Sequence, residues 1–274
     1  MMRTLELAGA QVPVIGQGTW RMGENPGQRR AEVAALREGL ERGLRLIDTA
    51  EMYGEGCAEE VVGEAIAGRR DQVFLVSKVY PHNASRAGVT AACERSLKRL
   101  GTDHLDLYLL HWRGQYPLAE TVEAFERLRE QGKIGRWGVS NFDLDDLEEL
   151  GDPACATNQV LYNPQERGVE FDLLPWQQRQ GMPLMAYCPL GQGGALLANR
   201  AMGQVAQQHG VSAAQVALAW ALRQPNVLVI PKAGDPLHLA ENAAAADLQL
   251  SEADLQAIDS AYPAPARKQR LQMV

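Results

Sequence analysis

Short apolar segments alternate with longer amphipathic segments along the whole chain, and this alternation constrains the fold more than any other feature. Eight of the apolar segments have the length and the Val, Ile and Leu content of buried strands, at residues 14–18, 45–48, 73–78, 105–111, 134–139, 157–160, 183–187 and 227–230. Successive segments that start at residues 45, 73, 105 and 134 are 28, 32 and 29 residues apart. This spacing accommodates one strand, one crossover helix and two short loops, so it predicts repeated βα units with a parallel sheet.

The segments between these strands carry helical periodicity and recognisable helix ends. Apolar residues recur with helical spacing up to Gly101, which is expected to end that helix. Ser212 is expected to cap a later helix. Ser251 and Asp254 form a capping-box pattern that predicts one more short helix through Ile258.

Eight βα units close most economically into a (β/α)₈ TIM barrel. An open doubly wound sheet would more naturally have five or six strands and a glycine-rich first turn, but the sequence after Gly16 and Gly18 lacks the third glycine of a dinucleotide fingerprint. Apolar residues on both sides of Gly9 predict an N-terminal β-hairpin that closes the bottom of the barrel. We expect a single α/β domain over residues 1–274, with a short C-terminal tail.

Composition excludes several classes of protein. The chain has 46% hydrophobic residues and a net charge of -7, from 27 Lys and Arg against 34 Asp and Glu, which disfavours broad binding to nucleic acid or to anionic membranes. It contains no apolar stretch near the roughly 20 residues of a membrane span. The four cysteines form neither a C-x-x-C pair nor a zinc-ligand cluster, so we expect reduced thiols, no metal site and a cytoplasmic protein.

Three successive expected strands end in a polar residue, and a fourth polar residue follows nearby. The strands run into Asp48, Lys78 and His111, and Tyr53 comes five residues after Asp48. Functional residues of α/β barrels lie at the carboxyl ends of the strands, so these four side chains are expected on one rim. Each alone has a structural explanation, such as capping or packing, but the four together favour catalysis.

The charges indicate which reaction these groups could serve. An ammonium about 4 Å from a phenolate, at an effective dielectric of about 20, contributes on the order of 4 kcal/mol. We therefore expect Lys78, held by Asp48, to bring the pKa of Tyr53 near neutrality, while His111 orients a carbonyl oxygen. Such a group fits protonation of a carbonyl as hydride reaches its carbon, and a nicotinamide cofactor must supply that hydride. A sugar-processing barrel would need two acids at strand ends, and only Asp48 is found.

At these residues the chain resembles the aldo-keto reductase superfamily. The resemblance lies in LIDTAEMYGEG, LVSKV, LYLLHW and GKIGRWGVSNF, and it continues through TNQVLYNP, MAYCPLG and VLVIPKAGDP, so it covers about residues 5–262. It implies that Tyr53 is the general acid, that Lys78 and Asp48 tune it, and that His111 orients the substrate.

The resemblance also implies an NADP(H) site, with NAD(H) as the less favoured cofactor. It assigns the nicotinamide contacts to Ser140, Asn141, Gln159 and Tyr187, and the pyrophosphate contacts to Leu190 and Gln192. The 2′-phosphate contacts fall to Lys232 and His238, and the adenine contacts to Glu241 and Asn242. The family often has an arginine where this chain has His238. A histidine is mostly neutral at pH 7 and cannot make a bidentate contact, so the preference for NADP(H) is weaker here.

Three aromatic residues, Trp20, Tyr80 and Trp112, follow expected strands and are expected to line the substrate mouth. Only residues 112–117 separate His111 from the next helical segment, which predicts an open pocket that discriminates weakly between carbonyl compounds. We therefore expect a monomeric enzyme that reduces aldehydes, including dicarbonyls such as methylglyoxal, and some ketones. The alternative is an NADP(H)-binding barrel with slow turnover that acts as a redox sensor or a regulatory subunit.

Overall fold

Eight parallel strands form the centre of the molecule in the computed structural model, which describes residues 2–274. Each strand pairs with the next one along the chain. The strands are β3 (Gln17–Gly18), β4 (Leu46–Asp48), β5 (Phe74–Val79), β6 (Leu105–Leu110), β7 (Ile134–Ser140), β8 (Cys155–Leu161), β9 (Leu184–Tyr187) and β10 (Val227–Val229). All eight predicted strands are confirmed, with ends that move by at most three residues.

Backbone hydrogen bonds between the first and last strand segments close the sheet into a barrel. The N–H of Gly16 donates to the carbonyl of Val229 over 2.8 Å, and the N–H of Val229 donates to the carbonyl of Val14 over 2.9 Å. At Gly18 a Cβ would lie 2.7 Å from the carbonyl oxygen of Ile230, so this close approach requires glycine. The predicted (β/α)₈ barrel is confirmed.

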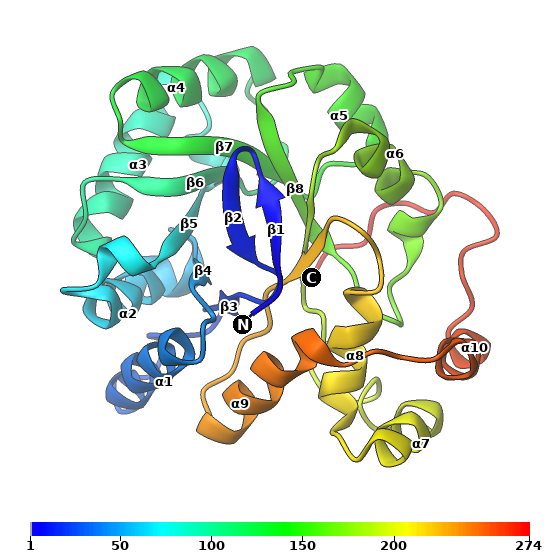
Figure 1. The fold of residues 1–274 in the computed structure, drawn as a ribbon. Coiled ribbons are helices and arrows are strands. Elements are labelled where there is room, and N and C mark those ends of the chain that lie inside the picture. The colour runs from blue at the N-terminus through cyan, green and yellow to red at the C-terminus, as the bar shows by residue number, and fades with distance from the viewer. Residues whose placement is uncertain (1) are drawn as a thin grey trace.

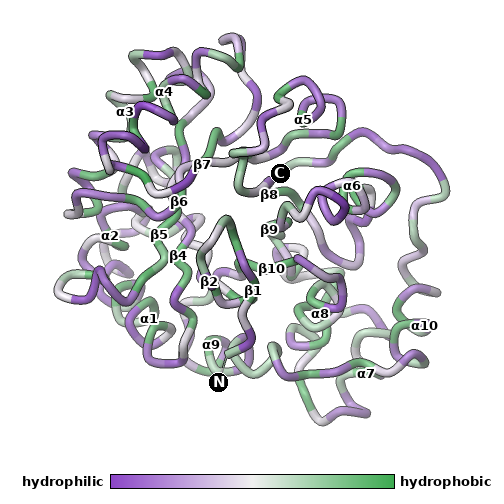
Figure 2. Tube along the Cα trace, turned by 45° about the horizontal axis from the view of Figure 1, so that its top comes forward, coloured by the Kyte–Doolittle hydropathy of each residue, from purple (hydrophilic) through white to green (hydrophobic). Residues whose placement is uncertain are grey.

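The helices form an outer ring around the strands (Figure 1). At least one helix follows each strand, because the crossover between parallel strands must return the chain over the outside of the sheet. They are α1 (Arg29–Glu41), α2 (Cys57–Ile66), α3 (Arg86–Leu100), α4 (Leu118–Glu130), α5 (Leu144–Leu150), α6 (Leu173–Gln180), α7 (Arg200–His209), α8 (Ala213–Ala221), α9 (Pro236–Ala244) and α10 (Glu252–Ala261). Hydrophobic and hydrophilic residues alternate along these helices, as expected for elements with one buried face (Figure 2).

The predicted helix ends are largely confirmed. Gly101 ends α3 in the left-handed conformation, at φ +64°. Ser212 caps α8, and Ser251 and Asp254 form a capping box at the start of α10. Helix α10 runs to Ala261 rather than to Ile258. Ile258 is its last buried residue, so the apolar pattern stops one turn before the backbone hydrogen bonds do.

The N-terminal hairpin closes one end of the barrel, as predicted. Its strands are β1 (Thr4–Leu7) and β2 (Ala10–Pro13), and Leu7 and Val12 are fully buried. Both pack with residues of the barrel interior, among them Leu46 and Leu107. Figure 1 shows the hairpin lying across the barrel opening that faces the viewer. The carboxyl ends of the strands, where the predicted site lies, are at the opposite end.

The chain after α10 has no regular secondary structure, yet it is tied to the barrel. Lys268 forms ion pairs with Asp143 and Asp172, the residues that precede α5 and α6. Leu271 packs against the hydrophobic core. Within residues 2–274 the structure contains no helix with the length and hydropathy needed to cross a bilayer.

Candidate active site

Lys78 is the centre of the candidate site, and all three of its N–H donors are used. Its side chain is 0% exposed, on β5 inside the barrel. The Nζ atom donates to Oδ2 of Asp48 over 2.7 Å, to the carbonyl oxygen of Thr49 over 2.8 Å and to the hydroxyl of Tyr53 over 3.2 Å. Because a lysine ammonium can only donate, the oxygen of Tyr53 is an acceptor in this contact. The proton of the Tyr53 hydroxyl therefore remains available to a further acceptor.

Tyr53 begins a short turn, η1 (Tyr53–Gly56), which lies directly before α2 and is not regular helix inside. Gly54, Glu55 and Gly56 have positive φ angles of 55°, 54° and 95°. Glu55 adopts the left-handed conformation without being a glycine, which costs on the order of 1 kcal/mol or more and requires support from its surroundings.

Burial dominates the electrostatics of the site. The pKa of Tyr53 is raised well above its ordinary value, first by burial and then by the negative charge of Asp48. The expectation that Lys78 brings the pKa of Tyr53 near neutrality is therefore wrong for this chain by itself. The first reason is burial, which disfavours the charged phenolate. In addition, Asp48 lies 2.7 Å from Lys78 and offsets the attraction between the ammonium and the phenolate. Burial also lowers the pKa of Lys78, while Asp48 acts in the opposite direction.

His111 follows β6 and lies beside Tyr53. The two rings pack edge to face with centroids 5.7 Å apart. Burial, followed by the positive charge of Lys78, holds the pKa of His111 well below its ordinary value, so the ring is neutral at pH 7. Its Nδ1 atom is buried without a hydrogen-bond partner among residues 2–274. An unpartnered buried N–H is rarer than an unpartnered acceptor, which favours the tautomer with the proton on Nε2.

All four residues predicted to contact nicotinamide form one hydrogen-bonded group next to Asp48. The amide of Gln159 donates to Oδ1 of Asp48 over 2.8 Å. Asn141 accepts from the hydroxyl of Tyr187 over 2.8 Å and donates to the carbonyl of His111 over 3.1 Å. The hydroxyl of Ser140 donates to the backbone carbonyl of Gln159 over 2.8 Å.

These four residues fit a flat ring that carries an amide. Asn141 is held in the left-handed conformation at φ +59°, so its side chain is fixed by backbone as well as by hydrogen bonds. The Gln159 side chain is 1% exposed, and its amide nitrogen is fixed by Asp48. Tyr187 is half-buried and offers an aromatic face.

The remaining predicted cofactor residues lie in two other segments. Leu190 and Gln192 belong to the loop after β9, in which residues 191–194 all have positive φ. Lys232 is exposed after β10, and His238 is exposed on α9. Glu241 accepts a hydrogen bond from Ser212 over 3.1 Å, and Asn242 is only 3% exposed. Both of the last two therefore also have structural roles.

Two of the three predicted substrate residues, Tyr80 and Trp112, form an aromatic wall beside His111. Trp112 lies 4.9 Å from the His111 ring and 5.1 Å from the Tyr80 ring, between centroids. Trp20 is half-buried after β3, and the guanidinium of Arg21 lies 4.5 Å from its ring centroid. As predicted, α4 begins at Leu118, so the segment beside this wall is short.

Sequence reasoning missed Glu51, which connects the Tyr53 and Tyr80 segments. Its carboxylate accepts from the backbone N–H of Tyr80 over 2.8 Å and from the side chain of Asn83 over 2.9 Å. It also forms an ion pair with Arg95 of α3. An acidic residue three positions after Asp48, just beyond a strand end, was the available signal.

Comparison with known proteins places this geometry in a family. The family model described as "Aldo/keto reductase family" matches residues 14–263. Methylglyoxal reductase YeaE of Escherichia coli (strain K12) is 56% identical over 271 residues, which cover 96% of this chain and 95% of that protein. Glyoxal reductase of Bacillus subtilis (strain 168) is 38% identical over 258 residues, covering 92% of this chain and 90% of that protein.

Solved structures give the same result. An aldo-keto reductase from Klebsiella pneumoniae, solved in complex with NADPH, superposes with a TM-score of 0.98 at 54% identity and with full coverage of both chains. The sequence, the barrel and the arrangement of strand-end residues agree, and the chain belongs to the aldo/keto reductase family.

Proposed function

We propose that this protein reduces aldehydes, small dicarbonyls such as methylglyoxal and some ketones to alcohols with NADPH. The observation that carries the proposal is the saturation of Lys78 by three acceptors, one of which is the hydroxyl of Tyr53. This arrangement leaves the Tyr53 proton directed away from Lys78. The reductase relatives and the NADPH-bound structure support the reaction type and the cofactor. None of these three comparisons favours the alternative of a slow regulatory barrel.

A bound reduced nicotinamide would supply the hydride. We assign its ring to the group formed by Ser140, Asn141, Gln159 and Tyr187, which combines amide partners with an aromatic face. The positively charged Lys232 would contact the 2′-phosphate, with the weaker help of His238. The pyrophosphate would be contacted by Leu190 and Gln192. The adenine would be contacted by Glu241 and Asn242.

The chain's own residues handle the oxygen of the carbonyl group. In the proposed mechanism His111 donates a hydrogen bond from Nε2 to the carbonyl oxygen and fixes its position. Tyr53 donates its proton to that oxygen as negative charge develops on it. Lys78 then stabilises the phenolate that Tyr53 becomes, and Asp48 keeps Lys78 in place. Such general-acid help is typically worth about 10² to 10⁴ in rate.

The substrate would enter beside Trp20, Tyr80 and Trp112. This wall is aromatic and the segment after His111 is short, which suits small carbonyl compounds of varied shape. We further propose that the chain acts as one barrel domain and as a monomer in the cytoplasm. All four candidate catalytic side chains come from this one chain, and the four cysteines are unpaired.

Replacing Tyr53 by phenylalanine tests the assignment. Tyr53→Phe should lower kcat for methylglyoxal by at least about 100-fold, the lower range of general-acid catalysis, because the proton is lost and the ring is kept. Its Kd for NADPH, measured by fluorescence quenching, should stay within about two-fold, because the phenol proton is not assigned to cofactor binding. Tyr108→Phe is the matched control, since it removes a buried hydroxyl that has no partner among residues 2–274. Unchanged turnover in Tyr53→Phe would remove Tyr53 from the acid role.

A further inference from the structure

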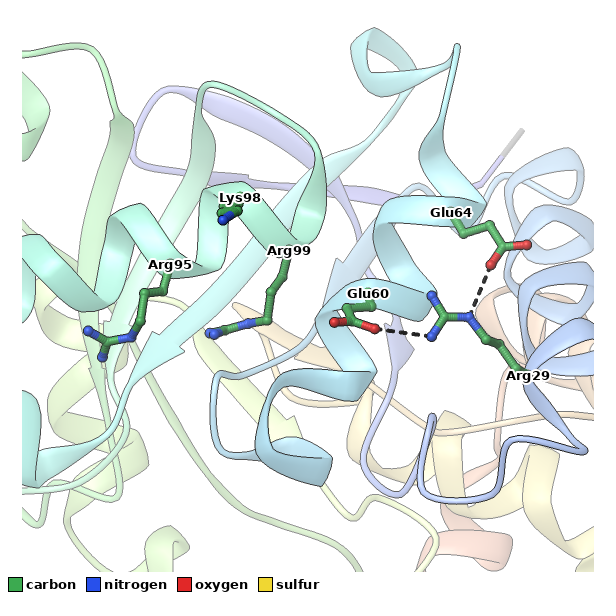
Figure 3. Close-up of a pocket in the computed structure, with 6 residues that line it drawn as sticks. All are labelled: Arg29, Glu60, Glu64, Arg95, Lys98 and Arg99. Atoms are coloured by element: carbon green, nitrogen blue, oxygen red, sulfur yellow. Dashed lines mark hydrogen bonds and ion pairs between the residues drawn. The ribbon is translucent and has the colours of Figure 1, made fainter.

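A groove on the outer surface lies between α1, α2 and α3 (Figure 3). Figure 3 shows that α3 contributes Arg95, Lys98 and Arg99 to it. On the other side, Arg29 of α1 pairs with two carboxylates of α2. Two arginines of the groove, Arg29 and Arg99, therefore bind acidic residues of α2. The partners of Arg29 are exposed, whereas the partner of Arg99 is buried.

Arg99 reaches a carboxylate that is enclosed by protein. Glu59, in the first turn of α2, is 0% exposed. It accepts from Nε of Arg99 over 2.6 Å and from the hydroxyl of Ser77 over 2.6 Å. Ser77 precedes Lys78 on β5, and successive side chains of a strand point to opposite faces. Glu59 thus binds the outer face of β5 at the position next to Lys78.

Arg99 also packs directly beneath the left-handed turn. A Cβ at Gly56 would lie 2.6 Å from Cδ and 2.6 Å from Nε of Arg99, so the side chain of Arg99 fills the space below this glycine. Gly56 ends the run of three residues with positive φ that begins directly after Tyr53. A strained turn persists only where its surroundings determine its conformation, and Arg99 is part of those surroundings.

A second arginine one helical turn earlier binds the other end of the same segment. Arg95 pairs with Glu51, two residues before Tyr53, over 3.2 Å. Residues four apart lie on one face of a helix. The same face of α3 therefore holds carboxylates before and after the turn that carries Tyr53.

We propose that Arg99, acting through Glu59 and Gly56, is a positioning residue that holds the Tyr53 hydroxyl and Lys78 in the geometry needed for proton transfer. This inference rests on the proposed acid role of Tyr53. The charge of Glu59 contributes as well, because it raises the pKa of Lys78 against the effect of burial and so favours the ammonium form.

The test compares Arg99→Met with Arg99→Lys and with the control Arg29→Met. Arg29 lines the same groove and pairs with Glu60 and Glu64, not with Glu59. The readouts are kcat and KM for methylglyoxal at saturating NADPH, the Kd for NADPH and the thermal midpoint. Misplacement of a reacting group by about 1 Å can cost 10²-fold in rate, so we expect Arg99→Met to lower kcat by about 10- to 100-fold with KM within about three-fold.

Two further comparisons distinguish a positioning role of Arg99 from a general loss of structure: the conservative variant Arg99→Lys, and Arg99→Met combined with Tyr53→Phe. Arg99→Lys keeps a cation near Glu59 and should recover most of the lost kcat, while Arg29→Met should stay within about two-fold of the parent because exposed ion pairs contribute little. If Arg99 acts through Tyr53, Arg99→Met should cause little further loss in a Tyr53→Phe background. Ser77→Ala removes one hydrogen bond to Glu59 and should lower kcat by about ten-fold, the rate equivalent of a weak hydrogen bond to a charged group. It decides the question if Arg99→Met does not fold.

The proposal is overturned if folded Arg99→Met, or Ser77→Ala, retains the parent kcat, or if Arg29→Met is equally impaired. An equal loss in the Tyr53→Phe background would also overturn it, since the effect would then not pass through Tyr53. These results are distinct from failure of the proposed function, which would appear as unchanged turnover in Tyr53→Phe itself.

Discussion

Replacing Asp48 by asparagine should destabilise the protein strongly, and the loss should depend on pH. Asp48 is 2% exposed and supplies the only carboxylate within hydrogen-bond distance of the fully buried Lys78, among residues 2–274. Asparagine has nearly the same shape and can still accept a hydrogen bond. The substitution therefore isolates the negative charge.

The magnitude follows from the geometry of the pair. At 2.7 Å and an effective dielectric of about 20, the attraction between unit charges is about 6 kcal/mol. Part of this is offset by the cost of burying both charges, and removing one partner of a buried pair typically costs about 3 to 5 kcal/mol. We expect Asp48→Asn to lower the free energy of unfolding at pH 7 by that amount.

The dependence on pH has a definite sign. Burial lowers the pKa of Lys78, and Asp48 is the largest influence that raises it. In Asp48→Asn the pKa of folded Lys78 falls further below its unfolded value, so the unfolded chain binds a proton that the folded chain releases. Stability then rises with pH in the window between the folded pKa and the unfolded value of about 10.4. The difference between parent and variant should be largest near neutral pH and should shrink toward pH 10.

Urea denaturation of the protein without added nucleotide, followed by tryptophan fluorescence at several pH values, measures both effects. Glu41→Gln is a suitable control, because it removes the charge of a 64% exposed partner of Arg69 and should cost less than about 1 kcal/mol. A loss below about 1 kcal/mol in Asp48→Asn at pH 7 would show that the Asp48–Lys78 pair does not contribute this free energy. A difference that grows with pH would refute the assignment of the effect to Lys78.

Two further predictions concern the cofactor and the imidazole. His238→Arg should tighten NADPH more than NADH in fluorescence titrations, because an arginine can grip a 2′-phosphate that NADH lacks; equal tightening of both would show that the 2′-phosphate is not bound there. Since burial and Lys78 lower the pKa of His111, kcat/KM should show no inflection near pH 6.5. An inflection there that disappears in His111→Gln would contradict a ring that stays neutral through this range.

The barrel could be predicted from sequence because its strands are defined by local signals. One example is Leu105–Leu110, a short and mostly apolar segment bounded by turns. All but one of its six residues are buried. Their regular spacing leaves few alternatives to a closed parallel sheet. The capping residues Ser212 and Ser251 likewise act within one turn of their own positions, so a local pattern identifies them.

The electrostatics of the site could not be predicted in the same way. The sequence places Lys78 and Tyr53 on one rim, but it does not reveal that Asp48 approaches the ammonium to 2.7 Å or that burial raises the pKa of the Tyr53 phenol. The carbonyl of Thr49, which takes the third donor of Lys78, is backbone and leaves no side-chain signal. Glu59 lies in the first turn of α2, where an acidic residue usually faces solvent and interacts with the helix dipole, yet it is fully buried here.

The raised pKa of Tyr53 suits an acid that must act on a carbonyl. A phenol that stays neutral at pH 7 keeps its proton until hydride addition makes the substrate oxygen strongly basic, so the proton is present when it is needed. The ammonium of Lys78 then lies 3.2 Å from the new phenolate, an attraction of up to about 5 kcal/mol at an effective dielectric of about 20, part of which Asp48 cancels. This stabilisation arises only as the proton leaves, and an interaction made only then lowers the barrier instead of the energy of the bound substrate. In the proposed mechanism Lys78 therefore has a role in the transfer even though it does not make the resting phenol acidic.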